Sequence, residues 1–317
     1  MSPPTVIVFG PTGSVGSATA LSAHKHNAKV ILAMRDTTKS IPGLTSEQET
    51  IGNFERVQAD LTSPESIHNA VTKTGAKHAF IYIAFGAKDA MRASIEALKG
   101  AGIETVVLLS SISVDMHGDL DAVPPSDFIA FTHAQVEVNL RDVFGEDGYV
   151  AIRPAFFASN SMWWRSGVLE GEVKVAYPAA RFDYIAPEDI GRVAGVLLVK
   201  GLPAGEDGSK RSFVGLVGPE KMSIREALGV IGNAVGKEVK VTKVDEQEAL
   251  RVMMTENGLP EPVAKTLLVQ LRQQEESGGF FNIPWYEEAS GNIQRYTGRP
   301  SLRFHQWVDL NKEKFLA

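Results

Sequence analysis

Short apolar runs alternate with longer amphipathic stretches through the first half of the chain. The apolar runs cover residues 6–9, 29–34, 54–60, 79–84, 105–110 and 149–153. Helical spacing follows at 14–26, from Pro64 with Ser63 as its N-cap, at 89–101 and at 127–144. This alternation predicts an α/β fold with a doubly wound parallel sheet. The strand ends of such a sheet face one crevice, where we expect Gly10, Arg35, Asp60, Phe85 and Ser110 to converge.

The regular alternation of apolar runs and helical stretches ends after residue 154. Helices are predicted at 187–199, 224–235, 246–257 and 260–276, with strands at 213–217 and 238–244 and a surface loop at 201–208. We therefore expect a parallel-sheet domain over residues 1–154. A smaller α/β region should cover 155–317, with some of its strands and helices returning to the first domain. Gly278 and Gly279 predict a helix stop. The alternative is a hinge for a lid walled by Phe280, Phe281, Trp285 and Tyr286.

Three glycines follow the first strand directly, as Gly10-x-x-Gly13-x-x-Gly16. Gly10 permits a sharp turn, Gly13 lets the backbone approach a phosphate, and Gly16 lets the next helix pack on the strand. The N-terminus of that helix presents free N–H groups and the positive end of its dipole to an anion. The motif predicts a dinucleotide pyrophosphate site formed by Gly10, Thr12, Gly13, Ser14, Val15 and Gly16.

The end of the second strand indicates which dinucleotide binds. An acidic residue there usually accepts hydrogen bonds from the ribose of NAD, whereas this chain has Arg35, with Lys39 nearby. A guanidinium at this position suits the 2′-phosphate of NADP. Asp36 opposes this interpretation, since its carboxylate can repel the phosphate or pair with Arg35. We favour NADP(H) over NAD(H).

Composition narrows the function classes. The 317-residue chain has no cysteine, which excludes disulfides, thiolate catalysis and thiolate metal sites. Its net charge of −6 argues against nucleic acid as a partner. The sequence has no run of about 18 apolar residues, so it predicts no membrane helix. No common zinc-protease or serine-hydrolase motif occurs, and we predict no metal site. The expectation is a cytoplasmic protein, and its oligomeric state stays open.

Several further motifs follow the glycine loop and Arg35-Asp36 in order along the chain. They are the 57–67 stretch with Asp60, Ile152-Arg-Pro154 with Asn160, and the 183–190 and 292–307 stretches. Together they resemble the NmrA-like branch of the atypical short-chain dehydrogenases, which includes isoflavone-reductase-like relatives. The resemblance implies a Rossmann domain, a small C-terminal α/β region and NADP binding. It also implies that Asp60 lies on the adenine side and that Phe85 and Gly86 lie along the cofactor.

The Tyr-x-x-x-Lys pair of ordinary short-chain dehydrogenases is absent, because no tyrosine has a lysine four residues later. In NmrA-like relatives a lysine often stands four residues before a glutamate on the corresponding helix, which puts His133 at the lysine position before Glu137. These two are one turn apart, so we expect a hydrogen bond that raises the pKa of His133 and prepares it as a general acid. The alternative is that His133 only lines the cofactor or substrate pocket.

Two further groups complete the candidate site. Ser110, assigned to the cofactor, precedes Ser111 and Ser113, either of which can hydrogen-bond a developing oxyanion, although serine is also common in turns. Aromatic side chains just past the sixth strand predict a pocket for a flat hydrophobic ligand, although some of them can equally belong to the core. The pocket members are Phe156, Phe157, Asn160, Met162, Trp163, Trp164 and Tyr177.

Three functions fit these features, because members of the resembled family differ in chemistry. The first is an NADPH-dependent reductase of a small hydrophobic carbonyl, enone or quinone, in secondary metabolism, with the proton from His133, water or the substrate's enol. The second is a non-redox isomerase, dehydratase or rearrangement enzyme that uses His133 and Glu137. The third is an NADP(H)-sensing regulatory protein with a protein partner.

Overall fold

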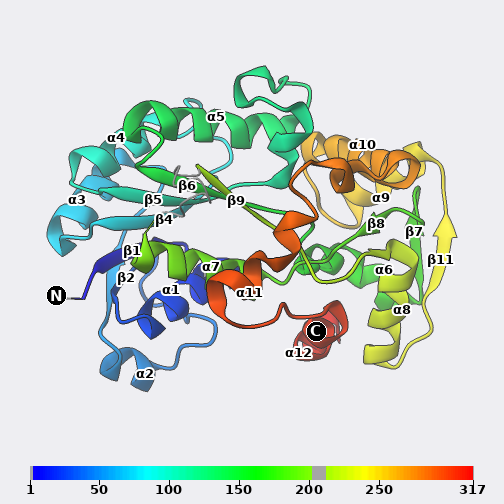
Figure 1. Cartoon of the computed structure of the whole chain (residues 1–317). Helices are drawn as coiled ribbons and strands as arrows, with labels where there is room; N and C mark the ends of the chain where they lie inside the picture. Colours follow the sequence, from blue (N-terminus) through cyan, green and yellow to red (C-terminus); the bar gives the residue numbers. More distant parts are fainter. Residues whose placement is uncertain (1–2, 202–211, 317) are drawn as a thin grey trace.

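A computed structural model describes residues 3–201 and 212–316. At its centre is a seven-stranded sheet in the order β3-β2-β1-β4-β5-β6-β9, with every pairing parallel (Figure 1). The strands are β1 (Thr5–Phe9), β2 (Lys29–Met34), β3 (Phe54–Gln58), β4 (His78–Tyr82), β5 (Thr105–Leu109), β6 (Tyr149–Pro154) and β9 (Phe213–Leu216). The strand order reverses at β1, which lies between β2 and β4. A ligand crevice is therefore expected beyond the carboxyl end of β1.

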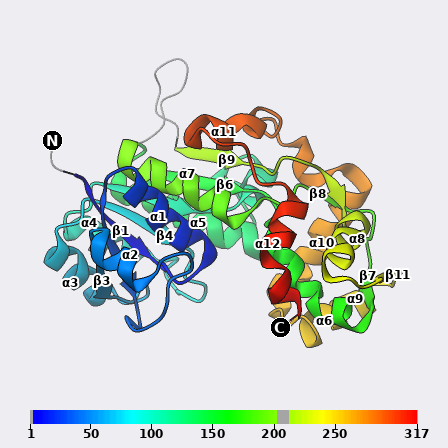
Figure 2. The same ribbon diagram turned by 90° about the horizontal axis from the view of Figure 1, so that it is seen from below.

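Helices cover both faces of this sheet, which confirms the predicted doubly wound fold. Along β1, Ile7 and Phe9 join the apolar core on one face, while Val6 and Val8 join the core on the other. The first face is covered by α3 (Pro64–Thr74), α4 (Arg92–Gly100) and α5 (Phe128–Phe144). The second is covered by α1 (Ser14–Lys25), α7 (Pro187–Lys200) and α11 (Asn292–Thr297) (Figures 1 and 2). The short α2 (Ser46–Ile51) packs beside β3.

Close packing of α7 on α1 fixes the helix that begins at the glycine loop. A Cβ atom at Gly191 would lie 2.4 Å from the carbonyl oxygen of Val15, and one at Gly195 would lie 2.6 Å from that of Thr19. The hydroxyl of Ser22 also donates to the carbonyl of Arg192 at 2.8 Å. Because α7 comes from the second half of the chain, residues beyond 154 hold part of the first domain in place.

The smaller region has its own apolar core. This region contains two strand pairs, β7 (Glu172–Val175) with β11 (Lys240–Lys243) and β8 (Arg181–Phe182) with β10 (Met222–Ser223). Its helices are α6 (Arg165–Glu170), α8 (Ile224–Val235), α9 (Glu246–Thr255), α10 (Glu261–Ser277) and α12 (Phe304–Leu316). The strand predicted at 213–217 is β9, which returns to the main sheet and pairs with β6 at its edge.

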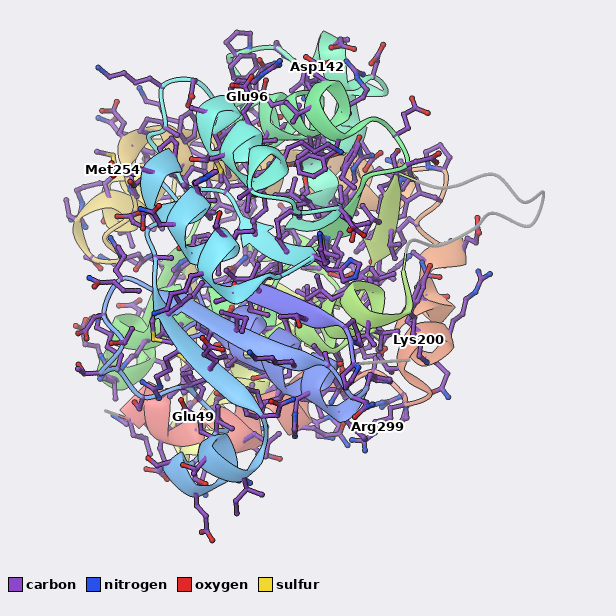
Figure 3. The ribbon with its side chains drawn as sticks, turned by 90° about the vertical axis from the view of Figure 1, so that its left-hand side faces the viewer. Glu49, Glu96, Asp142, Lys200, Met254 and Arg299 are labelled. Carbon is purple, nitrogen blue, oxygen red and sulfur yellow. The ribbon has the colours of Figure 1, made fainter. Side chains whose placement is uncertain are left out.

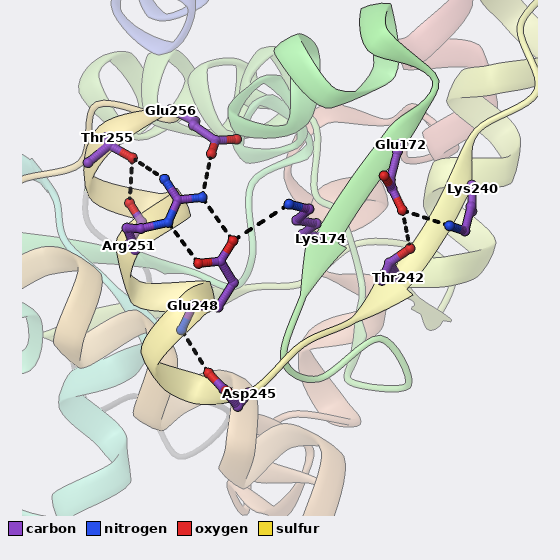
Figure 4. Close-up of polar contacts among 9 residues, drawn as sticks. All are labelled: Glu172, Lys174, Lys240, Thr242, Asp245, Glu248, Arg251, Thr255 and Glu256. Carbon is purple, nitrogen blue, oxygen red and sulfur yellow. Dashed lines mark hydrogen bonds and ion pairs between the residues drawn. The ribbon is translucent and has the colours of Figure 1, made fainter.

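Charged side chains of the smaller region pair with one another around β7 and β11 (Figure 4). Glu172 on β7 accepts from Lys240 at 2.9 Å and from Thr242 at 2.5 Å, which joins the two strands. On α9, Glu248 accepts from Arg251 at 2.7 Å, and this pair holds the pKa of Glu248 at about 2. These contacts lie at the surface of the smaller region.

The structure corrects the predicted start of α4 and decides what the glycine pair after α10 does. The helix predicted at 89–101 begins later, at Arg92, because Ala90 and Met91 adopt left-handed backbone angles, with φ of 48° and 65°. Arg92 then pairs with Glu96 and with Asp142 of α5, and both acids are labelled in Figure 3. The glycine pair after α10 is a helix stop, with Gly278 at φ 82°.

The lid alternative for that segment is wrong. Phe280 and Tyr286 belong to the core of the smaller region, and the Tyr286 hydroxyl donates to the buried carboxylate of Asp183 at 2.9 Å. The loop predicted at 201–208 lies outside the described residues apart from Gly201.

Candidate functional site

The glycine loop has the shape that a pyrophosphate needs. Gly10 turns the chain with φ of +69°, and a Cβ at Gly16 would lie 2.2 Å from the carbonyl oxygen of Gly10, so only glycine permits this contact between loop and helix. α1 begins after Gly13, with no side-chain cap and no acidic residue in its first turn. Its N–H groups and positive dipole end are therefore available to an anion.

A cavity of about 420 Å³ lies in front of this helix N-terminus. It is lined by the predicted residues Gly10, Thr12, Gly13, Ser14, Val15 and Gly16. Its other wall comes from Tyr82, Leu109, Phe157, Ser159 and Pro187, at the ends of β4, β5 and β6 and the start of α7. The site therefore runs from the phosphate loop towards an apolar end.

Tyr82 is a site residue that the sequence analysis missed. It is the last residue of β4, is 37% exposed, and lines both the cavity at the glycine loop and its neighbour. The sequence signal that could have found it is a tyrosine that closes the apolar run Ala79, Phe80 and Ile81, because the carboxyl end of a parallel strand faces the ligand crevice. A strand-end aromatic beside a glycine loop is placed to contact a bound nucleotide.

A neighbouring cavity of about 240 Å³ extends the site past the end of β2. It brings together Gly10, Arg35, Asp60 and Phe85, four of the five strand-end residues expected to converge. Asp60 accepts from the backbone and hydroxyl of Thr62, which lowers the pKa of its carboxyl, with a smaller contribution from Arg35.

The side chain of Arg35 is exposed beyond β2, over a further hollow shared with Gln58, Asp60 and Ser63. Asp36 does not pair with it: its carboxylate accepts from the hydroxyl and backbone of Thr38 at 2.6 and 2.9 Å, which lowers its pKa. Lys39 is also exposed. Arg35 thus places a cation at the end of the crevice beyond β2.

Arg56 holds this loop, and the sequence analysis did not single it out. Its guanidinium pairs with Glu49, which Figure 3 labels, and donates to the backbone carbonyls of Thr37 and Lys39. These contacts use four of its five N–H donors. Arg56 therefore positions the loop, while Arg35 remains the side chain that can reach a ligand.

Ser110 and Glu137 occupy a buried polar cluster instead of the crevice. Glu137 is fully buried; it accepts from the Ser110 hydroxyl at 2.5 Å and from two nitrogens of Arg153, at 3.2 and 2.5 Å. Arg153 also pairs with Asp115 at 2.8 Å. The assignments of Ser110 to the cofactor and of Glu137 to catalysis are corrected to a structural role, since both side chains are used within the core.

His133 has no carboxylate partner, which corrects the predicted hydrogen bond to Glu137. Its ring is buried, its Nδ1 atom has no hydrogen-bond partner, and burial lowers its pKa to about 4. The predicted rise in pKa is wrong because desolvation acts without a compensating charge. The ring meets Phe85 edge-on at 6.1 Å, and Phe85 stacks on Phe128 at 6.3 Å, just before Gly86 with φ of +94°. His133 is thus a neutral ring behind a wall of the cofactor cavity.

Ser111 takes part in a turn, the alternative that the sequence left open. It is the N-cap of the short helix η1 (Ile112–His117), where its hydroxyl accepts from the backbone of Ser113 at 3.2 Å and contacts the Ser113 hydroxyl at 2.8 Å. Ser113 is buried.

The predicted aromatic pocket is mostly core. Phe156 and Trp164 are 7% and 8% exposed, and Phe156 stacks on Phe182 at 4.1 Å. Tyr177 donates its hydroxyl to Glu246, and Trp163 packs edge-on against Phe156. Asn160 is half-buried within the helix η3 (Ala158–Trp164). Phe157 is the member of the predicted set that lines the cavity at the glycine loop.

A parallel sheet, a glycine loop that opens a helix, and a crevice at the strand reversal together define a dinucleotide-binding Rossmann protein. The family model described as NAD(P)H-binding matches residues 10–171. The nitrogen metabolite regulation-like protein bik4 of Gibberella fujikuroi is 37% identical over 316 residues, covering 96% of this chain and 95% of that protein. The chain therefore belongs to the NAD(P)H-binding, NmrA-like family.

Solved structures of low sequence identity share the fold. The NADPH complex of the quinone oxidoreductase QOR2 from Escherichia coli has a TM-score of 0.72 at 18% identity, covering 96% of this chain and 99% of that one. The NADP(H) complex of triphenylmethane reductase from Citrobacter has a TM-score of 0.71 at 16% identity, with the same coverage. Within the described residues, no helix is long and apolar enough to cross a membrane, and no cluster of three His, Asp or Glu side chains could hold a metal ion.

The open position of Gly13 gives a direct test of the phosphate site. A Cβ there would meet only the Gly10 carbonyl, at an ordinary 3.6 Å, so Gly13→Val should fold. We expect its side chain to take the space of the pyrophosphate and to weaken NADPH and NADH alike, by on the order of tenfold or more in calorimetric titration. Gly229→Val, in the distant helix α8, is the control. Unchanged affinity in Gly13→Val would place the pyrophosphate elsewhere.

Proposed function

We propose that this protein is an NADP(H)-dependent reductase of a small hydrophobic carbonyl, enone or quinone. The crevice carries the proposal: it runs from the cationic loop at Arg35, past the free N–H groups of α1, to an apolar end at Leu109 and Phe157. The two NADPH-dependent reductases named above share the fold, which supports the same class of chemistry.

Different residues of the chain would hold the parts of the cofactor and the substrate. The N-terminus of α1 would hold the pyrophosphate, Arg35 the 2′-phosphate, and Tyr82 and Phe157 the apolar walls. Bound NADPH supplies a hydride, so reduction by two electrons also needs one proton. His133 is neutral near pH 7, with a pKa of about 4, and is a poor acid for that step. We propose that the proton comes from water, and that His133 supports Phe85 at the cofactor wall.

Arg35 should select NADPH over NADH. Arg35→Ala removes a charge-assisted contact to the 2′-phosphate, so we expect NADPH binding to weaken by about 1.5–3 kcal/mol while NADH binding stays nearly unchanged. Calorimetric titration with both nucleotides measures this, and Lys39→Ala should show a smaller loss of the same kind. Equal losses for NADPH and NADH in Arg35→Ala would show that Arg35 does not recognise the phosphate.

A regulatory NADP(H)-binding protein is the second candidate. The relation to bik4, whose name describes it as nitrogen metabolite regulation-like, and the absence of the Tyr-x-x-x-Lys pair favour it. No contact supports the third candidate, a non-redox enzyme that uses His133 and Glu137 together. Glu137 is bound to Arg153 and Ser110 and does not contact His133.

One experiment separates the two remaining functions. Purified protein is mixed with NADPH and with a panel of neutral quinones, enones and aromatic ketones, and the loss of reduced nucleotide is followed by absorbance. A reductase oxidises NADPH with at least one compound class, and Gly13→Val abolishes that reaction. Tight NADPH binding with no oxidation by any class would favour the regulatory function.

A further inference from the structure

One serine lies among the apolar walls at the far end of the crevice. The cavity of about 420 Å³ at the glycine loop has Leu109, Phe157 and Pro187 as apolar walls away from the loop. Ser159 lines the same cavity, two residues after Phe157, and is half-buried. It does not line the neighbouring cavity past the end of β2, which holds Arg35. Ser159 therefore belongs to the end of the crevice where the proposed function brings the reactants together.

The hydroxyl of Ser159 has no hydrogen-bond partner within the part of the chain that the structure describes. Nearby serines use theirs inside the protein. Ser110, at the end of β5, donates to Glu137. Ser161, in the same helix η3, donates to the carbonyl of Ala158 at 2.6 Å. A hydroxyl without a partner in apolar surroundings is free to bond a molecule that enters the cavity.

Hydrogen bonds on the preceding residues hold the backbone at Ser159 in place. The N–H of Ala158 donates to the carbonyl of Ile185 at 2.8 Å, and the N–H of Ile185 donates to the carbonyl of Phe156 at 2.8 Å. The N–H of Phe156 also donates to the buried carboxylate of Asp183 at 3.2 Å. Because the backbone is fixed before a ligand arrives, a hydrogen bond from this serine costs little ordering of the chain.

We infer that Ser159 donates a hydrogen bond to the carbonyl oxygen of the substrate. The inference rests on the proposed reductase function and names the residue that selects a substrate with an oxygen acceptor. When a hydride adds to the carbonyl carbon of a ketone, or to the β-carbon of an enone, an electron pair moves to the oxygen. The serine keeps its own proton and stabilises that charge, and water then protonates the alkoxide or enolate and leaves as hydroxide.

Ser159→Ala tests the contact without turnover. With NADP⁺ bound, we expect the affinity for 4-phenyl-3-buten-2-one, measured by equilibrium dialysis, to fall several-fold because one hydrogen bond is lost. The hydrocarbon 1-phenyl-1-butene has the same carbon skeleton without the oxygen, so it should bind the native protein and the variant equally. NADPH affinity, measured by calorimetric titration, should stay unchanged.

Turnover tests the role of the hydroxyl in the reaction. In Ser159→Ala we expect kcat for the enone to fall by on the order of 10²-fold, while KM rises only several-fold, because the hydrogen bond strengthens as charge develops on the oxygen. Ser159→Thr keeps a hydroxyl and should recover most of the loss. Ser161→Ala is the matched control, since its hydroxyl bonds the chain itself, and it should keep the native preference for the enone over the hydrocarbon.

Binding and turnover give separate outcomes. Selective loss of enone affinity in Ser159→Ala supports the contact, even where native protein oxidises no NADPH and the reductase function fails. Three results would overturn the contact: equal enone affinity in native protein and Ser159→Ala, equal losses of enone and NADPH affinity, which would assign the hydroxyl to the cofactor, or native protein that does not bind the enone. NADPH oxidation that stays unchanged in Ser159→Ala would also overturn it, while leaving the reductase function standing.

Discussion

Arg153→Met is expected to lower the free energy of unfolding by about 3–5 kcal/mol, because it leaves two carboxylates without their cation. Glu137 is fully buried and the Asp115 side chain is 15% exposed, and both accept hydrogen bonds from the same guanidinium. Burial already raises the pKa of Asp115, even with Arg153 present. Removing the cation should destabilise the folded protein further, and denaturant titration measures the loss.

Arg92→Met is the matched control for this prediction. Arg92 also pairs with two carboxylates, Glu96 and Asp142, but all three side chains are partly or largely exposed. Exposed pairs contribute about 0–1 kcal/mol, so this variant should lose little stability. The double variant Arg153→Met/Glu137→Leu should recover part of the loss, since apolar side chains of similar size can replace a buried pair. Equal losses in Arg153→Met and Arg92→Met would contradict the structural role of the cluster.

Local patterns predicted the parts of this fold that depend on local forces. The run of apolar residues at 29–34 gave β2 with its observed bounds, and Ser63 is the N-cap of α3, where its hydroxyl accepts from the backbone of Ser66. The glycine spacing placed the phosphate loop, and the parallel order put Gly10, Arg35, Asp60 and Phe85 around one crevice. Each of these features follows from neighbours within a few residues, or from the geometry of any parallel sheet.

Side-chain partners from distant segments could not be predicted in the same way. Helical spacing made Glu137 a neighbour of His133. Arg153, however, comes from the next strand and Asp115 from the short helix η1 after β5, and their pairing decides where Glu137 points. Phe156 and Trp164 are apolar enough for either a pocket or a core, and only the packing of β8 and α12 against them selects the core.

The second prediction of large effect is that His133 makes the stability of the protein depend on pH. Burial lowers its pKa from the ordinary value of 6.5 to about 4. Between these two values the unfolded chain binds a proton that the folded protein does not, so stability is present above pH 6.5 and is lost as the pH falls towards 4. One pKa unit corresponds to about 1.4 kcal/mol, so the loss from this group is on the order of 3 kcal/mol.

Asp183 changes stability with pH in the opposite direction, so its contribution must be separated from that of His133. Its burial raises its pKa from 3.8 to about 6, so the folded protein takes up a proton before the unfolded chain does, and stability rises as the pH falls through 6. The acid sensitivity of the native protein therefore combines these two opposite contributions with those of other shifted groups, such as Asp115 and Glu248. Comparing variants at each pH isolates the histidine, because Asp183 is common to both.

His133→Leu should remove the histidine contribution and keep an apolar side chain of similar size behind Phe85. We expect similar stability to the native protein at pH 7.5 and a smaller loss on acidification to pH 4.5, measured by denaturant midpoints across the range. His68→Leu, at an exposed position on α3, should follow the native curve. If His133→Leu loses stability in parallel with the native protein, the ring is not held neutral by burial, and a protonated His133 with a catalytic role returns as the better interpretation.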